Sequence, residues 1–202
     1  MGIREKIIKL SENNLRKKVI IPLLNALGAY GTEDFHGPRE KGKDVYFSYK
    51  NLFGRNKHCC FFIKKGNIKK TGRNDIRNMK GAIEEAIKSE FTNPIDNKTP
   101  VRIEEFYFVC SGKINQEARE WLTEFLVKQS NFPNLDVFDI DSLIQFIVDL
   151  IKKFNNKIGE NYNFNISTFA SYCKKIVNHN HNNHAITDIA ITDSNEGKVI
   201  KI

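Results

Sequence analysis

The sequence lacks the patterns that mark several common classes of protein. No apolar run approaches the about 20 residues of a membrane-spanning helix, and the amino-terminal segment MGIREKIIKL has no apolar region of the signal-peptide type. The phosphate-binding loop of P-loop NTPases and the Gly-x-Ser-x-Gly elbow of serine hydrolases are also missing. We therefore expect a cytoplasmic protein with no membrane partner and no ATP binding through a P-loop, and a serine hydrolase has little support.

Cysteine is scarce, and its placement argues against a metal cluster. The four cysteines are Cys59, Cys60, Cys110 and Cys173, and no two of them form a Cys-x-x-Cys pair. Structural zinc sites usually contain such pairs, so a zinc site is not expected. Neighbours on a strand point to opposite faces, which makes Cys59 and Cys60 poor disulfide partners. Buried thiols are the expectation.

Basic residues outnumber acidic ones, and they are concentrated in one segment. The 202-residue chain carries a formal net charge of +8, which favours an anionic partner such as nucleic acid. Between residues 64 and 80 a single acid, Asp75, accompanies a run of bases. These bases are Lys64, Lys65, Lys69, Lys70, Arg73, Arg77 and Lys80. The segment is either a solvated face or a surface that contacts phosphates.

Helical and extended patterns alternate along the chain. Helices are expected over residues 15–30, 73–91, 115–129 and 141–154, and strands over 44–49, 57–64, 101–110 and 135–140. Pro22 lies inside the first helical pattern, where a kink or break is expected. Strands that alternate with helices late in the chain indicate parallel pairing and a layered α/β fold.

The composition changes near residue 155. We predict one domain over residues 1–154, and an Asn-rich linker, a carboxyl-terminal appendage or the start of a further domain over residues 155–202. His179, His181 and His184 lie in NHNHNNH, which is interpreted as a polar linker rather than a transition-metal site. A hairpin around SNEG is expected near the end, and the apolar pattern there favours a chain that belongs to a longer protein.

The segment EKGKDVYFSYKNLFGRNKHCCFFIKKG predicts a hairpin with chemistry at its open end. With the turn at Gly54, Asp44 and Lys64 are equidistant from it and lie opposite each other on one face. One interpretation is a cross-strand ion pair, worth about 1 kcal/mol or less when exposed. The other is a phosphodiester hydrolysis site, in which the carboxylate holds Mg²⁺ and the lysine stabilises developing charge.

Several segments in order carry a resemblance to a known family. They are LLNALGA, HGPREKGKDV, NLFGRN, FFIKKGNI, EEFYFVCSGKINQEAR and VFDIDSLIQFI. On these, residues 15–151 resemble the Mrr-like branch of the PD-(D/E)xK nucleases, including amino-terminal effector domains of antiviral STAND NTPases. The resemblance implies a restriction-endonuclease-like fold, a three-layer α/β sandwich with a mixed central sheet.

The same resemblance implies an activity and its partners. It implies a Mg²⁺-dependent DNA endonuclease, with Mn²⁺ as a substitute, that acts on double-stranded DNA as a homo-oligomer in restriction or anti-phage defence. A fused or partner NTPase or sensor domain would accompany it. By this resemblance Asp44 binds the metal, Lys64 is the catalytic lysine, and Glu40 is an upstream acid that is catalytic or contacts the metal. The carbonyl of Ile63 would be a further metal ligand.

One position departs from the family pattern. The family has Gln or Glu two residues before the lysine, and this chain has Phe62. The missing carboxylate is either supplied from elsewhere or lost, and the second case leaves a catalytically degenerate fold that serves as a DNA-binding or protein-interaction module. The candidate replacements are Glu33, Asp34, Glu84 and Glu85. The residues expected along the phosphate backbone are Lys65, Lys69, Lys70, Arg73 and Arg77.

Overall fold

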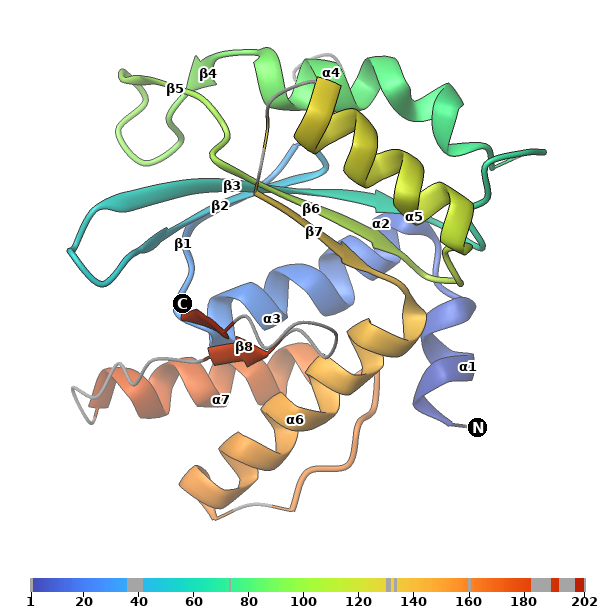
Figure 1. The fold of residues 1–202 in the computed structure, drawn as a ribbon. Coiled ribbons are helices and arrows are strands. Elements are labelled where there is room, and N and C mark those ends of the chain that lie inside the picture. Colours follow the sequence, from blue (N-terminus) through green and yellow to red (C-terminus); the bar gives the residue numbers. More distant parts are fainter. Residues whose placement is uncertain are drawn as a thin grey trace.

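A five-stranded mixed sheet forms the middle layer of the protein (Figure 1). The computed structural model describes residues 2–35, 42–72, 74–129, 132, 134–159, 161–182, 190–192 and 199–201. In order across the sheet, the strands are β1 (Tyr30–Asp34), β2 (Val45–Lys50), β3 (Asn56–Lys64), β6 (Glu105–Cys110) and β7 (Leu135–Phe138). The pairs β1–β2 and β2–β3 are antiparallel, whereas β3–β6 and β6–β7 are parallel.

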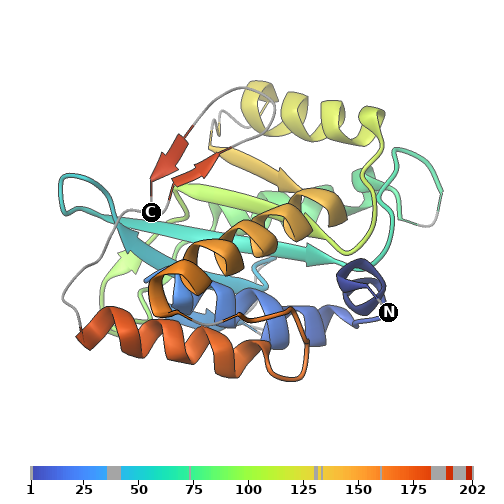
Figure 2. The ribbon, with the colours of Figure 1, turned by 90° about the horizontal axis from the view of Figure 1, so that it is seen from below.

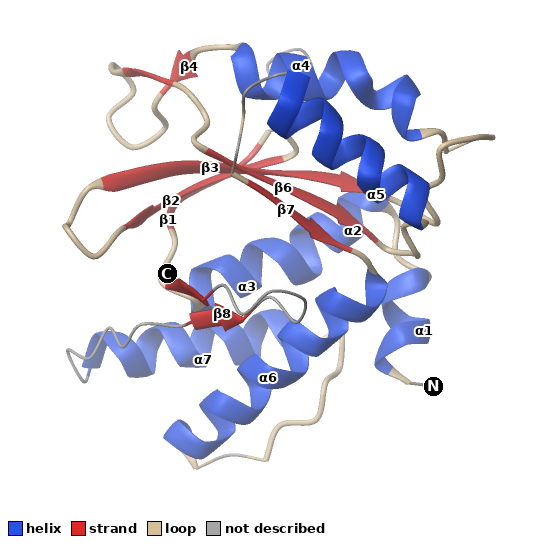
Figure 3. Cartoon of the chain, in the orientation of Figure 1, coloured by secondary structure: helices blue, strands red, loops and turns tan. Residues whose placement is uncertain are grey.

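Helices cover both faces of this sheet (Figures 1 and 3). One face carries α1 (Ile3–Ile8), α2 (Glu12–Leu15), η1 (Arg16–Ile20), α3 (Ile21–Ala26), α6 (Ile140–Ile158) and α7 (Phe169–Asn182). The other carries η2 (Ile76–Met79), α4 (Lys80–Lys88), α5 (Gln116–Thr123) and η3 (Glu124–Gln129). Two small antiparallel pairs complete the elements, β4 (Phe91–Thr92) with β5 (Pro100–Val101) and β8 (Ala190–Thr192) with β9 (Val199–Lys201). The prediction of a mixed α/β fold is therefore confirmed.

The central strand β3 is apolar on both sides, because both of its faces are covered. Cys59, Phe61 and Ile63 point into the core shared with α3, α6 and α7. Cys60 and Phe62 point into the core shared with α4 and α5. A strand buried on both faces has a nearly continuous apolar sequence, as this one does. All four cysteines are free and buried, which confirms the expectation of buried thiols.

The kink expected at Pro22 takes the form of a π-helical turn. Residues 16–20 form η1, which continues directly into α3, so Pro22 lies inside a continuous helix and gives no N–H to the turn before it. A proline ring clashes with the carbonyl four residues earlier, and a wider turn relieves that clash. The turn begins at Arg16, whose side chain is buried against the sheet.

Residues 155–159 and 161–182 pack on the same core as the residues before them, which a free linker would not do. The side chain of Asn155, inside α6, accepts a hydrogen bond from the Tyr172 hydroxyl at 2.9 Å. The rings of Tyr162 and Tyr172 stack with centroids 4.0 Å apart. Phe169 and Ile176 of α7 are fully buried. Figure 2 shows α7 beside α3 and α6.

The histidine-rich stretch is helical as far as the structure describes it. His179 and His181 lie in α7, whereas His184 lies outside the described residues. The expected hairpin near the end has its two strands in β8 and β9, although residues 193–198 between them are not described. Within the described ranges no helix is both long and apolar enough to cross a membrane.

Candidate active site

The register of the β2–β3 hairpin differs from the predicted one. Val45 pairs with Phe61, so the hairpin is centred one residue before Gly54. A shift of one residue at the centre moves every cross-strand partner by two. The prediction that Asp44 lies opposite Lys64 was therefore wrong, and Asp44 instead lies beside Ile63.

Two carboxylates complete the edge of β3 where its pairing with β2 ends. The backbone N–H of Ile63 donates to Asp44 Oδ2 at 2.6 Å, and the N–H of Lys65 donates to Glu12 Oε1 at 2.9 Å. These are alternate amides on one side of the strand, which a neighbouring strand would otherwise bind. The Asp44 side chain is only 5% exposed, so its carboxylate is held in place by these surroundings.

Glu12 is a site residue that the sequence analysis missed. Its Oε2 lies 3.8 Å from Lys64 Nζ, which brings a second carboxylate to the candidate catalytic lysine. Glu12 opens α2 directly after Ser11, whose hydroxyl caps the helix by accepting from the Asn14 N–H at 3.2 Å. An acid after a capping serine indicates only a helix start in a sequence. Nothing in the pattern linked it to Lys64 and Lys65, more than 50 residues later.

Arg16 connects Asp44 to Asp34 inside the same site. It lies one helical turn after Glu12, and its guanidinium is 5% exposed. Its Nη1 lies 3.5 Å from Asp44 Oδ1, and its Nε forms an ion pair with Asp34 Oδ1. The helical turn from α2 to η1 thus presents an acid to Lys64 and a base to Asp44.

Phe62 occupies the position where the family pattern has a carboxylate or amide, and it belongs to the core. Its side chain is buried, and its ring lies 5.7 Å from the ring of Phe108. The ammonium of Lys64 lies 4.5 Å from the centroid of the Phe62 ring. A cation over an aromatic face is attracted by the ring. Phe62 therefore orients Lys64 and supplies no metal ligand.

Of the remaining acidic candidates, the structure connects only Asp34 to the site among those it describes. Asp34 reaches the site through Arg16. Glu84 pairs with Lys88 of its own helix at 3.3 Å, and Glu33 and Glu85 are exposed. Glu40 lies outside the described residues. Among the residues the structure describes, no three His, Cys, Asp or Glu side chains lie close enough to hold a metal ion.

The basic segment after β3 divides into paired and unpaired cations. Lys65 and Lys69 are exposed and Lys70 is partly exposed, and within the described residues no ion pair involves them. Arg77 instead binds Asp75, with its Nε 3.0 Å from Oδ1 and its Nη2 2.5 Å from Oδ2. This guanidinium lowers the pKa of Asp75. Three of the five predicted DNA-binding side chains are thus available, Arg77 is neutralised, and Arg73 lies outside the described part.

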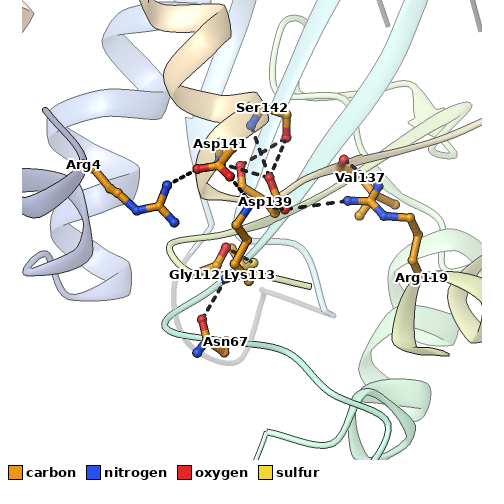
Figure 4. Close-up of polar contacts among 10 residues, drawn as sticks. Arg4, Asn67, Gly112, Lys113, Arg119, Val137, Asp139, Asp141 and Ser142 are labelled. Carbon is orange, nitrogen blue, oxygen red and sulfur yellow. Dashed lines mark hydrogen bonds and ion pairs between the residues drawn. The ribbon is translucent and has the colours of Figure 1, made fainter. Parts of the chain in front are cut away.

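A neighbouring cluster at the ends of β6 and β7 joins three bases, Arg4, Lys113 and Arg119, to two acids, Asp139 and Asp141 (Figure 4). Lys113 binds Asp141, and Arg119 lies 4.0 Å from Asp139. Asp139 caps α6 by accepting from the Asp141 N–H at 3.0 Å. The side chain of Asn67 accepts from the Lys113 N–H at 2.8 Å and ties the basic segment to this cluster. The cluster therefore stabilises the end of the sheet, and each of its three bases has a carboxylate partner.

The donor chemistry of the site suits a hard divalent cation, but the carboxylates are engaged. Mg²⁺ commonly takes one or two protein carboxylates and keeps its waters, with oxygen ligands at about 2.1 Å. The amides of Ile63 and Lys65 are about 7 Å apart at the usual strand rise, so the oxygens bound to them cannot share one ion. The second oxygens face Arg16 and Lys64. One of these two cations must yield before Asp44 and Glu12 can bind a metal together.

Comparison with known proteins identifies no relative of this chain: no family model, no curated protein and no solved structure matches it.

Proposed function

We propose that this chain is a metal-dependent DNA endonuclease domain with the restriction-endonuclease-like, three-layer form of the α/β fold. The observation that supports it most directly is the convergence of Glu12, Asp44 and Lys64 at the carboxyl end of β3. Two acids and a lysine are the residue types that phosphodiester hydrolysis uses, and Glu12 would supply the carboxylate that Phe62 does not.

The residues would divide the chemistry between them. Asp44 and Glu12 would hold Mg²⁺ or Mn²⁺, with the Ile63 carbonyl and Glu40 as further proposed ligands. The bound ion would lower the pKa of a water and neutralise phosphate charge. Lys64, held against the Phe62 ring, would direct its ammonium at the phosphate oxygens and stabilise the charge that develops there.

The exposed lysines beside the site support double-stranded DNA as the substrate. Lys65, Lys69 and Lys70 follow directly on β3, so they would contact phosphates next to the cleaved bond without reading sequence. Cutting both strands would need two copies of the site, hence a homo-oligomer. The role as an effector beside a sensor or NTPase domain remains part of the same proposal.

A catalytically degenerate nuclease fold is the second candidate. It is favoured by the engagement of both carboxylates with backbone amides and of both second oxygens with cations. In that case Asp44 and Glu12 serve only to complete the strand edge, and the basic segment binds nucleic acid or a protein partner.

Plasmid cleavage separates these candidates. The native chain would be incubated with supercoiled DNA and Mg²⁺ or Mn²⁺, beside Asp44→Asn, Lys64→Met and the exposed-site control Glu85→Gln. We expect nicking by the native chain and the control, and at least about a hundredfold loss in the two site variants. Cleavage that survives Asp44→Asn would refute the site, and no cleavage by any form would favour the degenerate module.

Salt dependence of DNA binding tests the basic surface. The double variant Lys69→Ala/Lys70→Ala should flatten the slope of log affinity against log salt by about 2, since each phosphate contact contributes about 0.9. The matched control Lys152→Ala/Lys174→Ala removes two exposed charges from α6 and α7. If both double variants changed the salt slope equally, the basic segment would contribute only to the overall charge of the protein and would not contact the phosphates.

A further inference from the structure

Among the residues the structure describes, the ion pairs around Asp44 join three acids to three bases. The three acids are Glu12, Asp34 and Asp44, and the three bases paired with them are Arg16, Lys17 and Lys64. Lys17 Nζ lies 3.6 Å from Asp34 Oδ2 and is exposed, whereas Arg16 and Asp44 are each 5% exposed. Lys43, next to Asp44 in the chain, directs its ammonium to Ser89 Oγ at 2.7 Å.

Two nitrogens of the Arg16 guanidinium have a hydrogen-bond acceptor, and the third, Nε, has an ion pair with Asp34 but no hydrogen bond within the described part of the chain. Nε pairs with Asp34, Nη1 lies 3.5 Å from Asp44 Oδ1, and Nη2 donates to Asn13 Oδ1 at 3.1 Å. Water screens a buried charge poorly, so a divalent cation added to this set would face a nearby unscreened guanidinium. The planar fork of arginine thus occupies the place where a metal would neutralise the same two carboxylates.

We propose that Arg16 is the resident counter-ion of Asp34 and Asp44, and that a divalent cation binds Asp44 only when this guanidinium moves away. Because the phosphates of DNA offer the displaced guanidinium a new anionic partner, metal binding is coupled to DNA binding. The free protein binds divalent cations weakly, and the complex with DNA binds them tightly. The inference rests on the proposed function for the identity of the metal and of the DNA.

Calorimetric titration of the free protein with Mn²⁺ tests the displacement. Arg16→Met keeps the apolar stem and removes the charge. We expect it to bind Mn²⁺ at least about tenfold more tightly than the native chain, because one unit charge about 4 Å away exceeds the about 1.4 kcal/mol that a tenfold change needs. The control Lys17→Met removes an exposed partner of the same Asp34 and should change the affinity less than about threefold. Asp44→Asn added to Arg16→Met should abolish the gain.

The outcomes decide the proposal even if the variant folds poorly. Arg16→Met that is unfolded in a chelator and folded in Mn²⁺ would support it, since the cation then replaces the guanidinium. Two results would overturn the proposal. Either Arg16→Met stays unfolded in the chelator and in Mn²⁺, or it folds and binds Mn²⁺ no more tightly than the native chain.

Titration in the presence of DNA tests the coupling and separates it from the nuclease proposal. A duplex with phosphorothioate linkages should raise the Mn²⁺ affinity of the native chain by about tenfold or more, and that of Arg16→Met by much less. An equal rise in both would refute the coupling. Asp44-dependent Mn²⁺ binding without plasmid cleavage would leave this inference standing and remove the nuclease. Plasmid cleavage by the native chain, together with an unchanged Mn²⁺ affinity in Arg16→Met, would support the nuclease and refute this inference.

Discussion

Replacing Asp44 with alanine should destabilise the fold as well as any activity. The Ile63 N–H would lose a 2.6 Å hydrogen bond in a buried place, and a buried unsatisfied donor costs about 1–3 kcal/mol. Arg16 would lose one of its two carboxylates. Breaking a buried pair outright costs about 3–5 kcal/mol, and the remaining Asp34 reduces that penalty. We expect a total near 3 kcal/mol.

Asparagine at the same position separates the two contributions. Asp44→Asn keeps an oxygen for the Ile63 N–H and removes only the charge opposite Arg16. We therefore expect it to cost about half as much as Asp44→Ala, or about 1.5 kcal/mol.

Urea denaturation followed by circular dichroism at pH 7 measures both values. With a slope of about 2–3 kcal/mol per molar urea, Asp44→Ala should shift the midpoint by about 1 M without changing the slope. The reasoning fails if Asp44→Ala lies within 1 kcal/mol of the native chain, or if Asp44→Asn costs as much as Asp44→Ala. Either result would mean that the carboxylate does not hold the edge of β3.

Three further predictions concern stability, pH and thiol reactivity. A Cβ on Gly42, where φ is +72°, would lie 1.9 Å from the Ala82 carbonyl oxygen. Gly42→Ala should therefore lower the free energy of unfolding, measured in urea, by about 3 kcal/mol or more. The control Gly54→Ala, with φ +73° and open space around the Cβ, should lower it by about 1 kcal/mol. Burial lowers the pKa of His58, whose Nδ1 lies 2.7 Å from the Tyr46 hydroxyl. The unfolded state therefore binds more protons than the folded state, so the free energy of unfolding should fall as the pH drops from 7 to 5. Urea titrations at each pH should show a smaller fall in His58→Gln. Burial raises the pKa of all four thiols, so Ellman's reagent should detect none of them in the folded chain and all of them in guanidinium.

The sequence predicted the layered fold because each major element carries a complete pattern of its own. The strand Glu105–Cys110 is apolar from Phe106 onward, and the last predicted helix has a strong amphipathic pattern, although its cap is Asp139 and not Asp141 as the sequence suggested. The strand β1 was missed because its sequence, YGTED, has no run of apolar residues, and none of its side chains is fully buried. Its pairing with β2 depends on contacts that no local pattern records.

The site was predicted in part, and the errors have physical causes. The hairpin register depends on Asn51, whose Oδ1 accepts from the N–H groups of Phe53 and Arg55 at 3.0 Å each. This turn moves the centre of the hairpin away from the glycine that marked it in the sequence. Glu12 and Arg16 could not be found, since their roles arise only when a helix packs across the end of a strand.

The packing of α7 determines how the chain can be divided for experiment. A fragment that ends at residue 154 would lose Phe169, Tyr172 and Ile176, which are buried against α3 and α6. The apolar surface left bare on those helices would favour self-association and precipitation. A fragment ending after residue 182 keeps that surface covered and is the smaller piece expected to remain in solution.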